Sequence, residues 1–194
     1  MVAAARETLA STFRALVNVL EQSGGSYLIV GGLAQAVIGE PRMTQDVDCI
    51  VAIQPKALPT LVDALERKRF TVDRQAINKQ AESVGTFSIG RGRWRIDVIL
   101  ASTDLETSAF QRAQRLRLYE TVANFPTPED LILLKLVPGR DKDLLDITAV
   151  MVRHRDRLDR AYLERWAQRL SDEAEDARIW QTLQRLLREA DALG

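Results

Sequence analysis

Residues 27–53 read YLIVGGLAQAVIGEPRMTQDVDCIVAI, and this stretch decides the fold. It begins with a short apolar and aromatic run that is typical of a β-strand, and the pair Gly31-Gly32 ends that run. The segment LAQAVIG at 33–39 favours a short helix, and VDCIVAI at 47–53 favours a second strand. The sequence therefore predicts the order strand, glycine turn, helix, acidic strand.

Two aspartates, Asp46 and Asp48, stand at the start of the second predicted strand. Side chains two residues apart on a strand point to the same face, so these carboxylates are expected side by side. Two divalent metal ions roughly 3.5 to 4 Å apart would suit that geometry. Gly31 and Gly32 leave bare backbone N–H groups at the beginning of a helix, where the helix dipole favours anions. The stretch thus predicts a phosphate site beside a metal site.

The composition is that of a soluble globular protein. The 194 residues are 46% hydrophobic, enough to bury a core and to form one domain with an appended subdomain. The 27 basic residues balance the 27 acidic ones, so no overall charge indicates a nucleic acid or membrane partner. The single cysteine, Cys49, excludes an internal disulfide and a cysteine-based zinc cluster, and it fits a reducing compartment. Charges at Arg6 and Glu7 interrupt any signal peptide, so we expect a cytoplasmic protein with no membrane partner.

Apolar periodicity predicts the remaining elements. We expect helices over 3–21, from 55 and over 103–114, and strands over 70–76, 84–89, 94–100 and 118–123, with a hairpin at 90–93. The sheet would then have about five strands. The segment FPTPED at 125–130 marks a boundary, after which helices are predicted over 131–137, 141–152, 158–170 and 174–192. The fold class is α+β, with one domain at 1–125 and a helical subdomain at 126–194.

A lone acid, Asp97, interrupts the apolar strand that reads RWRIDVIL at 93–100. Alternation places Asp97 and Arg95 on the face opposite to Trp94, Ile96 and Val98. One interpretation is an edge-strand aspartate paired with Arg95. The other is a third carboxylate that completes the site of the two aspartates in the preceding acidic strand, with the glycine pair as a phosphate cradle.

The pattern GG-x13-DxD followed by RIDV resembles the nucleotidyltransferase superfamily, which is built on a polymerase-β-like palm. Members of that superfamily move a nucleoside monophosphate from a triphosphate to an acceptor. The resemblance implies a small mixed sheet flanked by helices, and a core site of Gly31, Gly32, Asp46, Asp48 and Asp97.

Two longer blocks, PRMTQDVD at 41–48 and PTPEDLILLKLVPGRDKDLLDI at 126–147, are similar to the abortive-infection toxin-type (AbiEii-like) nucleotidyltransferases and their relatives. The likeness covers roughly 27–147. It implies that Lys135 is the triphosphate-facing or catalytic lysine and that Asp143 is its accompanying acid, with Asp146 one turn further on. It also implies the toxin-like member of a defence or toxin–antitoxin pair, with an antitoxin-like protein partner.

Several residues have two interpretations at this stage. Arg42 and Thr44 precede the acids, where the guanidinium could reach phosphate and the hydroxyl could hold the turn; Arg42 could instead pair with Asp46 or Glu40. Asp143 and Asp146 share a helix face, away from Lys142, and they either serve the site or cap the helix after Gly139. We assign Cys49 to packing and His154 to the surface.

The predicted activity is a Mg2+-dependent nucleotidyl transfer. In the expected site, Asp46, Asp48 and Asp97 bind two Mg2+ ions, or Mn2+ in their place, and Lys135 or Arg42 adds positive charge. The substrates would be a nucleoside triphosphate and a hydroxyl of RNA, protein or a small molecule. A nucleotide-binding or partner-binding module that kept the fold and lost turnover is the alternative.

An RNA acceptor is suggested by a series of arginines. They are Arg91, Arg93 and Arg95 along the predicted hairpin, followed by Arg112, Arg115 and Arg117. Solvated charges on a hairpin are the other interpretation of the same residues.

Overall fold

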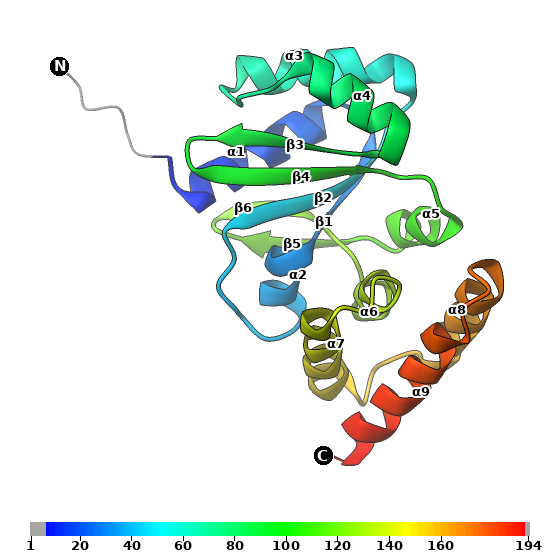
Figure 1. Ribbon diagram of the computed structural model, residues 1–194. Coiled ribbons are helices and arrows are strands. Elements are labelled where there is room, and N and C mark those ends of the chain that lie inside the picture. Colours follow the sequence, from blue (N-terminus) through cyan, green and yellow to red (C-terminus); the bar gives the residue numbers. More distant parts are fainter. Residues whose placement is uncertain (1–6, 193–194) are drawn as a thin grey trace. The chain divides into compact units, whose positions relative to one another are not determined.

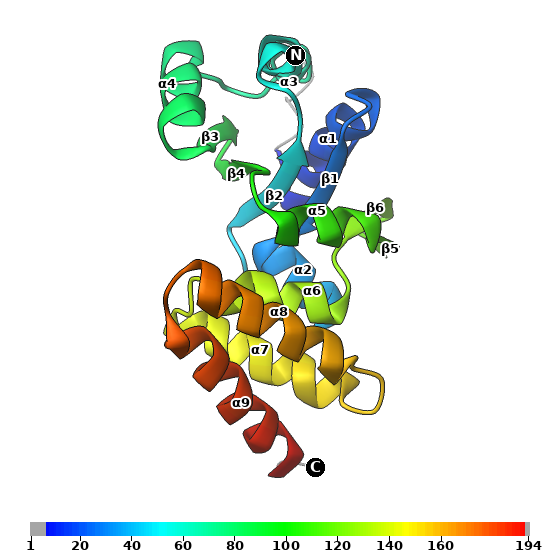
Figure 2. The ribbon, with the colours of Figure 1, turned by 90° about the vertical axis from the view of Figure 1, so that its right-hand side faces the viewer.

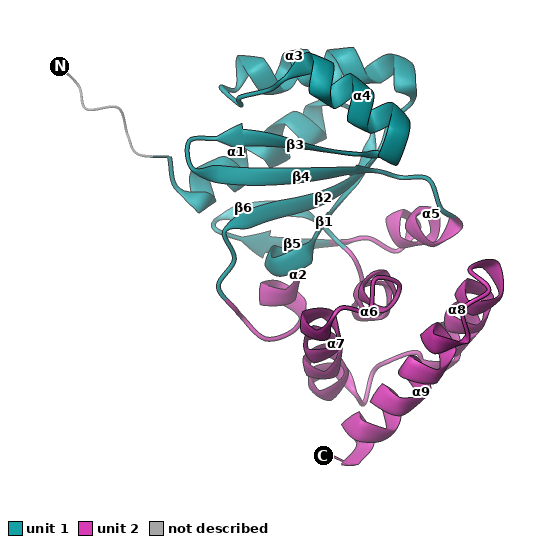
Figure 3. Cartoon of the chain, viewed as in Figure 1, with its two compact units in different colours: residues 1–33, 43–103, 115–125 teal, residues 34–42, 104–114, 126–194 magenta. Residues whose placement is uncertain are grey.

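The computed structural model describes residues 7–192 (Figure 1). The described chain forms two compact units, which Figure 3 shows in two colours. The first unit holds residues 7–33, 43–103 and 115–125, and the second holds 34–42, 104–114 and 126–192. Among the described residues, no helix is both long enough and apolar enough to span a membrane.

The first unit contains a four-stranded mixed sheet with the order β1-β2-β4-β3. Its strands are β1 (Ser26–Val30), β2 (Asp46–Ala52), β3 (Thr86–Arg91) and β4 (Trp94–Leu100). β2 runs parallel to β4, whereas the β1–β2 and β3–β4 pairs are antiparallel. The strands β5 (Gln114–Leu118) and β6 (Thr121–Phe125) form a separate two-stranded sheet.

One face of the sheet is apolar, and the other combines buried apolar residues such as Leu28 and Ile50 with polar side chains. Helices α1 (Leu9–Gln22), α3 (Leu58–Arg67) and α4 (Arg74–Val84) accompany it, and a 3-10 turn at Pro55–Ala57 precedes α3. Figure 1 shows α1 behind the sheet. The buried core of this unit includes Phe13, Leu16 and Leu20 of α1, Leu61 and Leu65 of α3, and Cys49, Phe87, Ile96 and Val98 of the strands. Residues one position away along β2 and β4 face the opposite side, which is where the aspartates lie.

The second unit is helical. It contains α5 (Asp104–Gln111), α6 (Pro128–Leu136), α7 (Asp141–His154), α8 (Arg160–Glu173) and α9 (Ala177–Ala192), and α2 (Gly31–Ile38) enters it after its first turn. α6 packs against α7, and α8 packs against α9, as Figure 2 shows. The Thr127 side chain accepts a hydrogen bond from the Asp130 backbone N–H and caps α6, with Pro128 next in line.

The α+β class and the central strand, glycine turn, helix and acidic strand are confirmed. The hairpin between 84–89 and 94–100 is also confirmed, with Gly92 in the left-handed region at φ +61°. The helix predicted over 3–21 lies partly outside the described residues, and its expected start at residue 3 is among those not described. Within them, α1 begins at Leu9, after a capping box in which Thr8 and Ser11 each accept the other's backbone N–H.

The strand predicted over 70–76 is wrong. Asp73 caps a helix there by accepting the Ala76 N–H, and only a single bridge between Thr71 and Gly90 remains of the expected pairing. The helix that follows, α4, buries only Ile77, so its apolar periodicity was too weak to show in the sequence. The main sheet therefore has four strands instead of about five.

The single strand predicted over 118–123 is a two-stranded hairpin. Its turn residues, Tyr119 and Glu120, have φ values of 47° and 60°. Turns of this kind usually contain Asn or Gly, which tolerate positive φ, so the sequence carried no turn signal. The surface assignment of His154 also needs correction, because its side chain is half-buried and hydrogen-bonds the Ile38 carbonyl through Nε2.

Candidate active site

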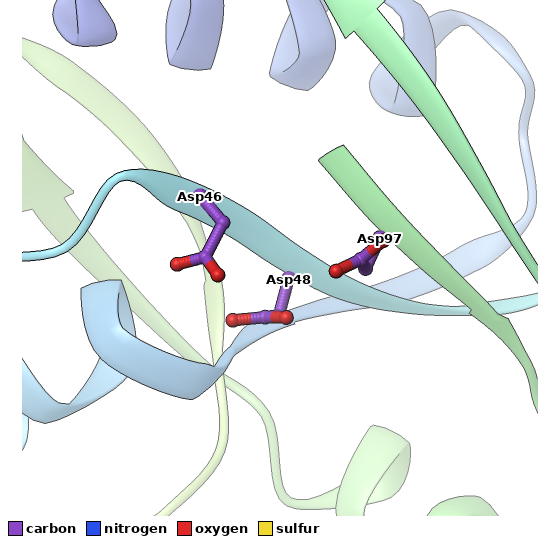
Figure 4. Close-up of side chains that lie close together, drawn as sticks. All are labelled: Asp46, Asp48 and Asp97. Atoms are coloured by element: carbon purple, nitrogen blue, oxygen red, sulfur yellow. The ribbon is translucent and has the colours of Figure 1, made fainter. Parts of the chain in front are cut away.

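Three carboxylates meet on one face of the main sheet. Asp48 of β2 lies directly opposite Asp97 of β4 in the parallel pairing, and Asp46 lies one pair further along the same face. Each offers an oxygen within 4.8 Å of the others, and each side chain is half-buried. Figure 4 shows the three side chains gathered around one point beside the beginning of α2. The structure thus brings together the three acids that the sequence singled out.

Parallel pairing of β2 with β4 explains why acids 49 residues apart meet, since Asp48 and Asp97 occupy matched positions. The alternate residues of β2, Val47 and Cys49, point to the opposite face and are fully buried. Burial, followed by the nearby charges of Asp48 and Asp97, raises the pKa of the Cys49 thiol. The thiol is therefore protonated and packed in the core, as expected.

Neighbouring side chains orient two of the carboxylates. The Thr44 hydroxyl donates to Asp46 Oδ1 at 2.6 Å, so it does hold the turn before the acidic strand. Ser88 Oγ donates to Asp97 Oδ1 at 2.6 Å, and Arg95 Nε donates to the same oxygen at 2.8 Å. The pairing of Asp97 with Arg95 is thus real, but β4 is an interior strand and not the edge strand of that interpretation.

The glycine pair allows the beginning of α2 to approach the acidic strand. Gly31 has φ +61°, and a Cβ there would lie 1.8 Å from Asp48 Oδ2. A Cβ on Gly32 would lie 2.6 Å from Thr44 Oγ1. Any larger residue at either position would have to displace the acids or the threonine that holds them. The two glycines stand at the start of α2, as predicted from the sequence.

A second charged cluster lies within the helical unit. Lys135 of α6 is buried, and its Nζ lies 2.6 Å from Asp146 Oδ2 and 3.7 Å from Asp143 Oδ1. Arg42 donates from Nε and Nη2 to both oxygens of Asp146, at 3.1 and 3.3 Å. Arg140 Nε donates to Asp143 Oδ2 at 2.5 Å. The structure therefore groups Arg42, Lys135 and the two acids of α7 together within the second unit.

Two sequence interpretations are settled by this cluster. Arg42 pairs with Asp146, so the suggested pairing with Asp46 or Glu40 is wrong. Asp143 and Asp146 do share a face of α7, and Lys142 is exposed away from them, as predicted. Their carboxylates bind cations of the cluster instead of capping the helix.

Sequence reasoning missed Ser88, and it gave Arg95 two interpretations, as a partner of Asp97 and as part of a basic stripe. The hairpin contained the necessary signal, because a two-residue turn at Gly92-Arg93 sets Ser88 opposite Asp97 and Gly90 opposite Arg95. The partnership of Arg42 with Asp146 had no comparable signal, since these residues are 104 positions apart.

The predicted basic stripe is broken up by ion pairs within the described residues. Arg91 binds Glu7, Arg115 binds Glu21, and Arg117 binds Glu120. Arg112 binds Glu129 and Asp130, and Arg93 lies over the Trp94 ring at 4.5 Å. Most of these guanidinium groups therefore have acidic neighbours of their own.

Comparison with known proteins places this chain among the nucleotidyltransferases. The chain belongs to the family described as "Nucleotidyltransferase of unknown function (DUF6036)", whose model matches residues 7–190. No curated protein matches the sequence. The family supports the superfamily predicted from the motifs, whereas nothing in the comparisons confirms the AbiEii-like subtype.

Solved structures of an antibiotic-resistance factor share the fold. The solution structure of ANT(2'')-Ia is 11% identical with a TM-score of 0.50, and the match covers 95% of this chain and 93% of that one. A crystal structure of ANT(2'')-Ia in complex with adenylyl-2''-tobramycin is 14% identical with a TM-score of 0.51, and the match covers 94% and 98%. At these identities the likeness concerns the fold alone.

Proposed function

We propose that this chain moves a nucleoside monophosphate from a nucleoside triphosphate to a hydroxyl acceptor, with divalent metal ions held by Asp46, Asp48 and Asp97. The observation that carries the proposal is the convergence of these three carboxylates from two parallel strands. Hard oxygen donors in such a group fit Mg2+ or Mn2+. The family of the chain supports the same class of reaction.

The residues at the sheet would bind and orient the reactants. Asp46 and Asp48 would hold two ions between them, and Asp97 would complete the set of oxygen donors. When bound, the ions supply Lewis-acid activation of the acceptor hydroxyl and neutralise the phosphate oxygens. Thr44 fixes the rotamer of Asp46 through its 2.6 Å hydrogen bond. The backbone N–H groups of Gly31 and Gly32 would face the phosphates, because no side chain blocks them.

The toxin-type likeness supplies the positively charged residues of the proposal. We extend to Lys135, Arg42 and Asp143 the triphosphate-facing roles implied by the toxin-type likeness. Lys135 would act from a position fixed by two carboxylates, and Arg42 still has one guanidinium nitrogen, Nη1, beyond the two that bind Asp146. Charge placed in advance in this way lowers the cost of reorganisation during phosphoryl transfer.

The acceptor defines the biological role, and three classes are open to test. A small-molecule hydroxyl is favoured by the ANT(2'')-Ia fold relative, whose complex contains an adenylylated aminoglycoside. RNA and protein acceptors remain part of the proposal, together with a toxin-like role and an antitoxin-like partner, which rest on the motif likeness at 41–48 and 126–147. Growth arrest on expression of the chain would support the toxin-like role.

The deciding experiment measures pyrophosphate release from each of the four nucleoside triphosphates, with Mg2+ or Mn2+. The acceptor panel would contain aminoglycosides, tRNA and whole-cell protein. We expect release with at least one acceptor, and its loss in Asp48→Asn but not in Asp63→Asn. Asp63 is a suitable control because its side chain is 48% exposed and pairs with Arg74. Metal-dependent nucleotide binding without release across the panel would instead indicate the catalytically silent module.

A further inference from the structure

One basic residue stands in the same array as the three acids. In the parallel pairing, Asp46 lies opposite Arg95 and Asp48 lies opposite Asp97, so four side chains occupy neighbouring positions on one face of β2 and β4. Three of the four are carboxylates, and the fourth is a guanidinium. On the other side of β4, Arg95 lies opposite Gly90 of β3.

The contacts of Arg95 are concentrated on the third acid. Its Nε donates to Asp97 Oδ1 at 2.8 Å, and its Nη2 donates to Ser88 Oγ at 3.0 Å. Ser88 donates to the same Asp97 oxygen, so Oδ1 already accepts two hydrogen bonds and Oδ2 is the oxygen left for a metal ion. An arginine guanidinium stays protonated at any accessible pH, so Arg95 is a permanent cation beside the proposed metal site.

Arg95 is nevertheless not a buried structural cation. Its side chain is 67% exposed, whereas the Asp97 side chain is 29% exposed. An exposed ion pair contributes little to stability, so the position of this arginine is not explained by folding alone. A guanidinium presents five donors, and the two in use leave Nη1 and one further N–H available to an incoming oxyanion. The nearest oxyanion in the proposed reaction is the triphosphate chain.

We propose that Arg95 is a substrate-binding residue that contacts the triphosphate chain next to the Asp46–Asp48–Asp97 site. This inference rests on the proposed function and adds a residue to it. The balance of charge supports this contact. Three carboxylates and two divalent ions have a net charge of +1, so a bound nucleoside triphosphate of charge −4 brings the site to −3. Arg95 reduces this excess to −2. Arginine suits this contact because its planar group binds phosphate oxygens in pairs.

The test separates metal binding from triphosphate binding. The proteins compared are wild type, Arg95→Gln and Arg93→Gln. Electron paramagnetic resonance would measure their affinity for Mn2+ alone. Calorimetry would then measure their affinity for inorganic tripolyphosphate in the presence of Mg2+. Tripolyphosphate carries the phosphate chain with no base, so the nucleotide need not be known. Arg93 is the matched control, since it is an exposed arginine in the turn of the same hairpin.

We expect Arg95→Gln to weaken tripolyphosphate binding by about 10- to 100-fold, as for loss of a charge-assisted pair. Its Mn2+ affinity should be equal to or higher than that of wild type, because a positive neighbour is removed. Arg95→Lys should recover part of the loss, and Arg93→Gln should bind both ligands as wild type does.

Three outcomes would overturn the inference, and they differ in what else they affect. Unchanged tripolyphosphate binding in Arg95→Gln removes the role of Arg95 and leaves the proposed function intact. An equal fall in Mn2+ and tripolyphosphate affinity shows that Arg95 only positions Asp97. Wild type that binds neither Mn2+ nor tripolyphosphate contradicts the proposed function and this inference together.

Discussion

The replacement of Gly31 by alanine gives a direct test of how closely α2 approaches the acidic strand. Gly31 has φ +61°, a conformation that costs an L-residue about 1 to 2 kcal/mol. The added Cβ would also meet Asp48 Oδ2 at 1.8 Å and Asp48 Cβ at 2.9 Å, so the strand or the helix must shift. Overpacking of this kind costs about 1 to 3 kcal/mol. We therefore expect Gly31→Ala to lose about 2 to 5 kcal/mol of unfolding free energy.

The chain offers a matched control in Gly24. Its φ of +69° is nearly the same, but a Cβ there would meet nothing within 4 Å. Gly24→Ala should therefore lose only the conformational cost, about 1 to 2 kcal/mol. Any stiffening of the unfolded chain by alanine is common to both variants and cancels in the comparison. The difference between the variants, about 1 to 3 kcal/mol, isolates the close approach to Asp48.

Urea unfolding at a constant m-value would measure both costs, and Mn2+ titration would follow the site. Gly31→Ala should also weaken Mn2+ binding, because Asp48 can no longer keep its position, whereas Gly24→Ala should not. If Gly31→Ala is no less stable than Gly24→Ala, then the close approach is easily relaxed and the glycine does not shape the site.

Three further outcomes are expected. Without metal, Asp48→Asn should be at least as stable as wild type, because it relieves repulsion among three carboxylates, and calorimetric unfolding of the variant should show no stabilisation by Mn2+. A metal-independent loss of about 1 kcal/mol of unfolding free energy would contradict this. Lys135→Met should cost about 1 to 3 kcal/mol in urea unfolding, because two buried acids lose their shared cation while keeping Arg42 and Arg140 as partners. Exposed Lys142→Met should stay within about 0.5 kcal/mol, and similar losses in both variants would contradict the prediction. Burial and the hydrogen bond to Asp130 raise the pKa of Tyr162 from 10 to about 12. Wild type should therefore lose stability faster than Tyr162→Phe between about pH 10 and 12, and parallel curves of unfolding free energy against pH would contradict this.

The parts of the fold that the sequence predicted depend on local patterns. The glycine pair after an apolar run, the alternation of strand 94–100 and the Thr127-Pro128 helix start each act within a few residues, and each is present in the structure. The helix at 74–84 was not predicted, because it is polar and buries a single residue, Ile77. Its local signals were the cap at Asp73 and the left-handed Gly85 at its end, which apolar periodicity does not detect.

The candidate site also has a part that local patterns predict and a part that they do not. The acids of the sheet were predictable because residue types and spacing alone place two carboxylates on one strand face, and a lone acid in an apolar strand requires a partner. The grouping of Lys135 with Arg42 through Asp146 was not predictable, since it depends on helix packing over more than a hundred residues of chain. Periodicity shows which face of a helix is buried but not which residue of another element it contacts.

The arrangement around the acids indicates what the sheet is built to bind. Three carboxylates within 4.8 Å repel one another, and a fold that gained nothing from them would be more stable with neutral residues there. Here Thr44, Ser88 and Arg95 each donate to one of these acids, so the carboxylates are held close together instead of turning apart into solvent. The only cation among these donors is largely exposed, and one guanidinium leaves two negative charges uncompensated. A site that orients like charges at close range without neutralising them is prepared for cations from solution, and this is the property that Mn2+ titration of the wild-type protein would measure first.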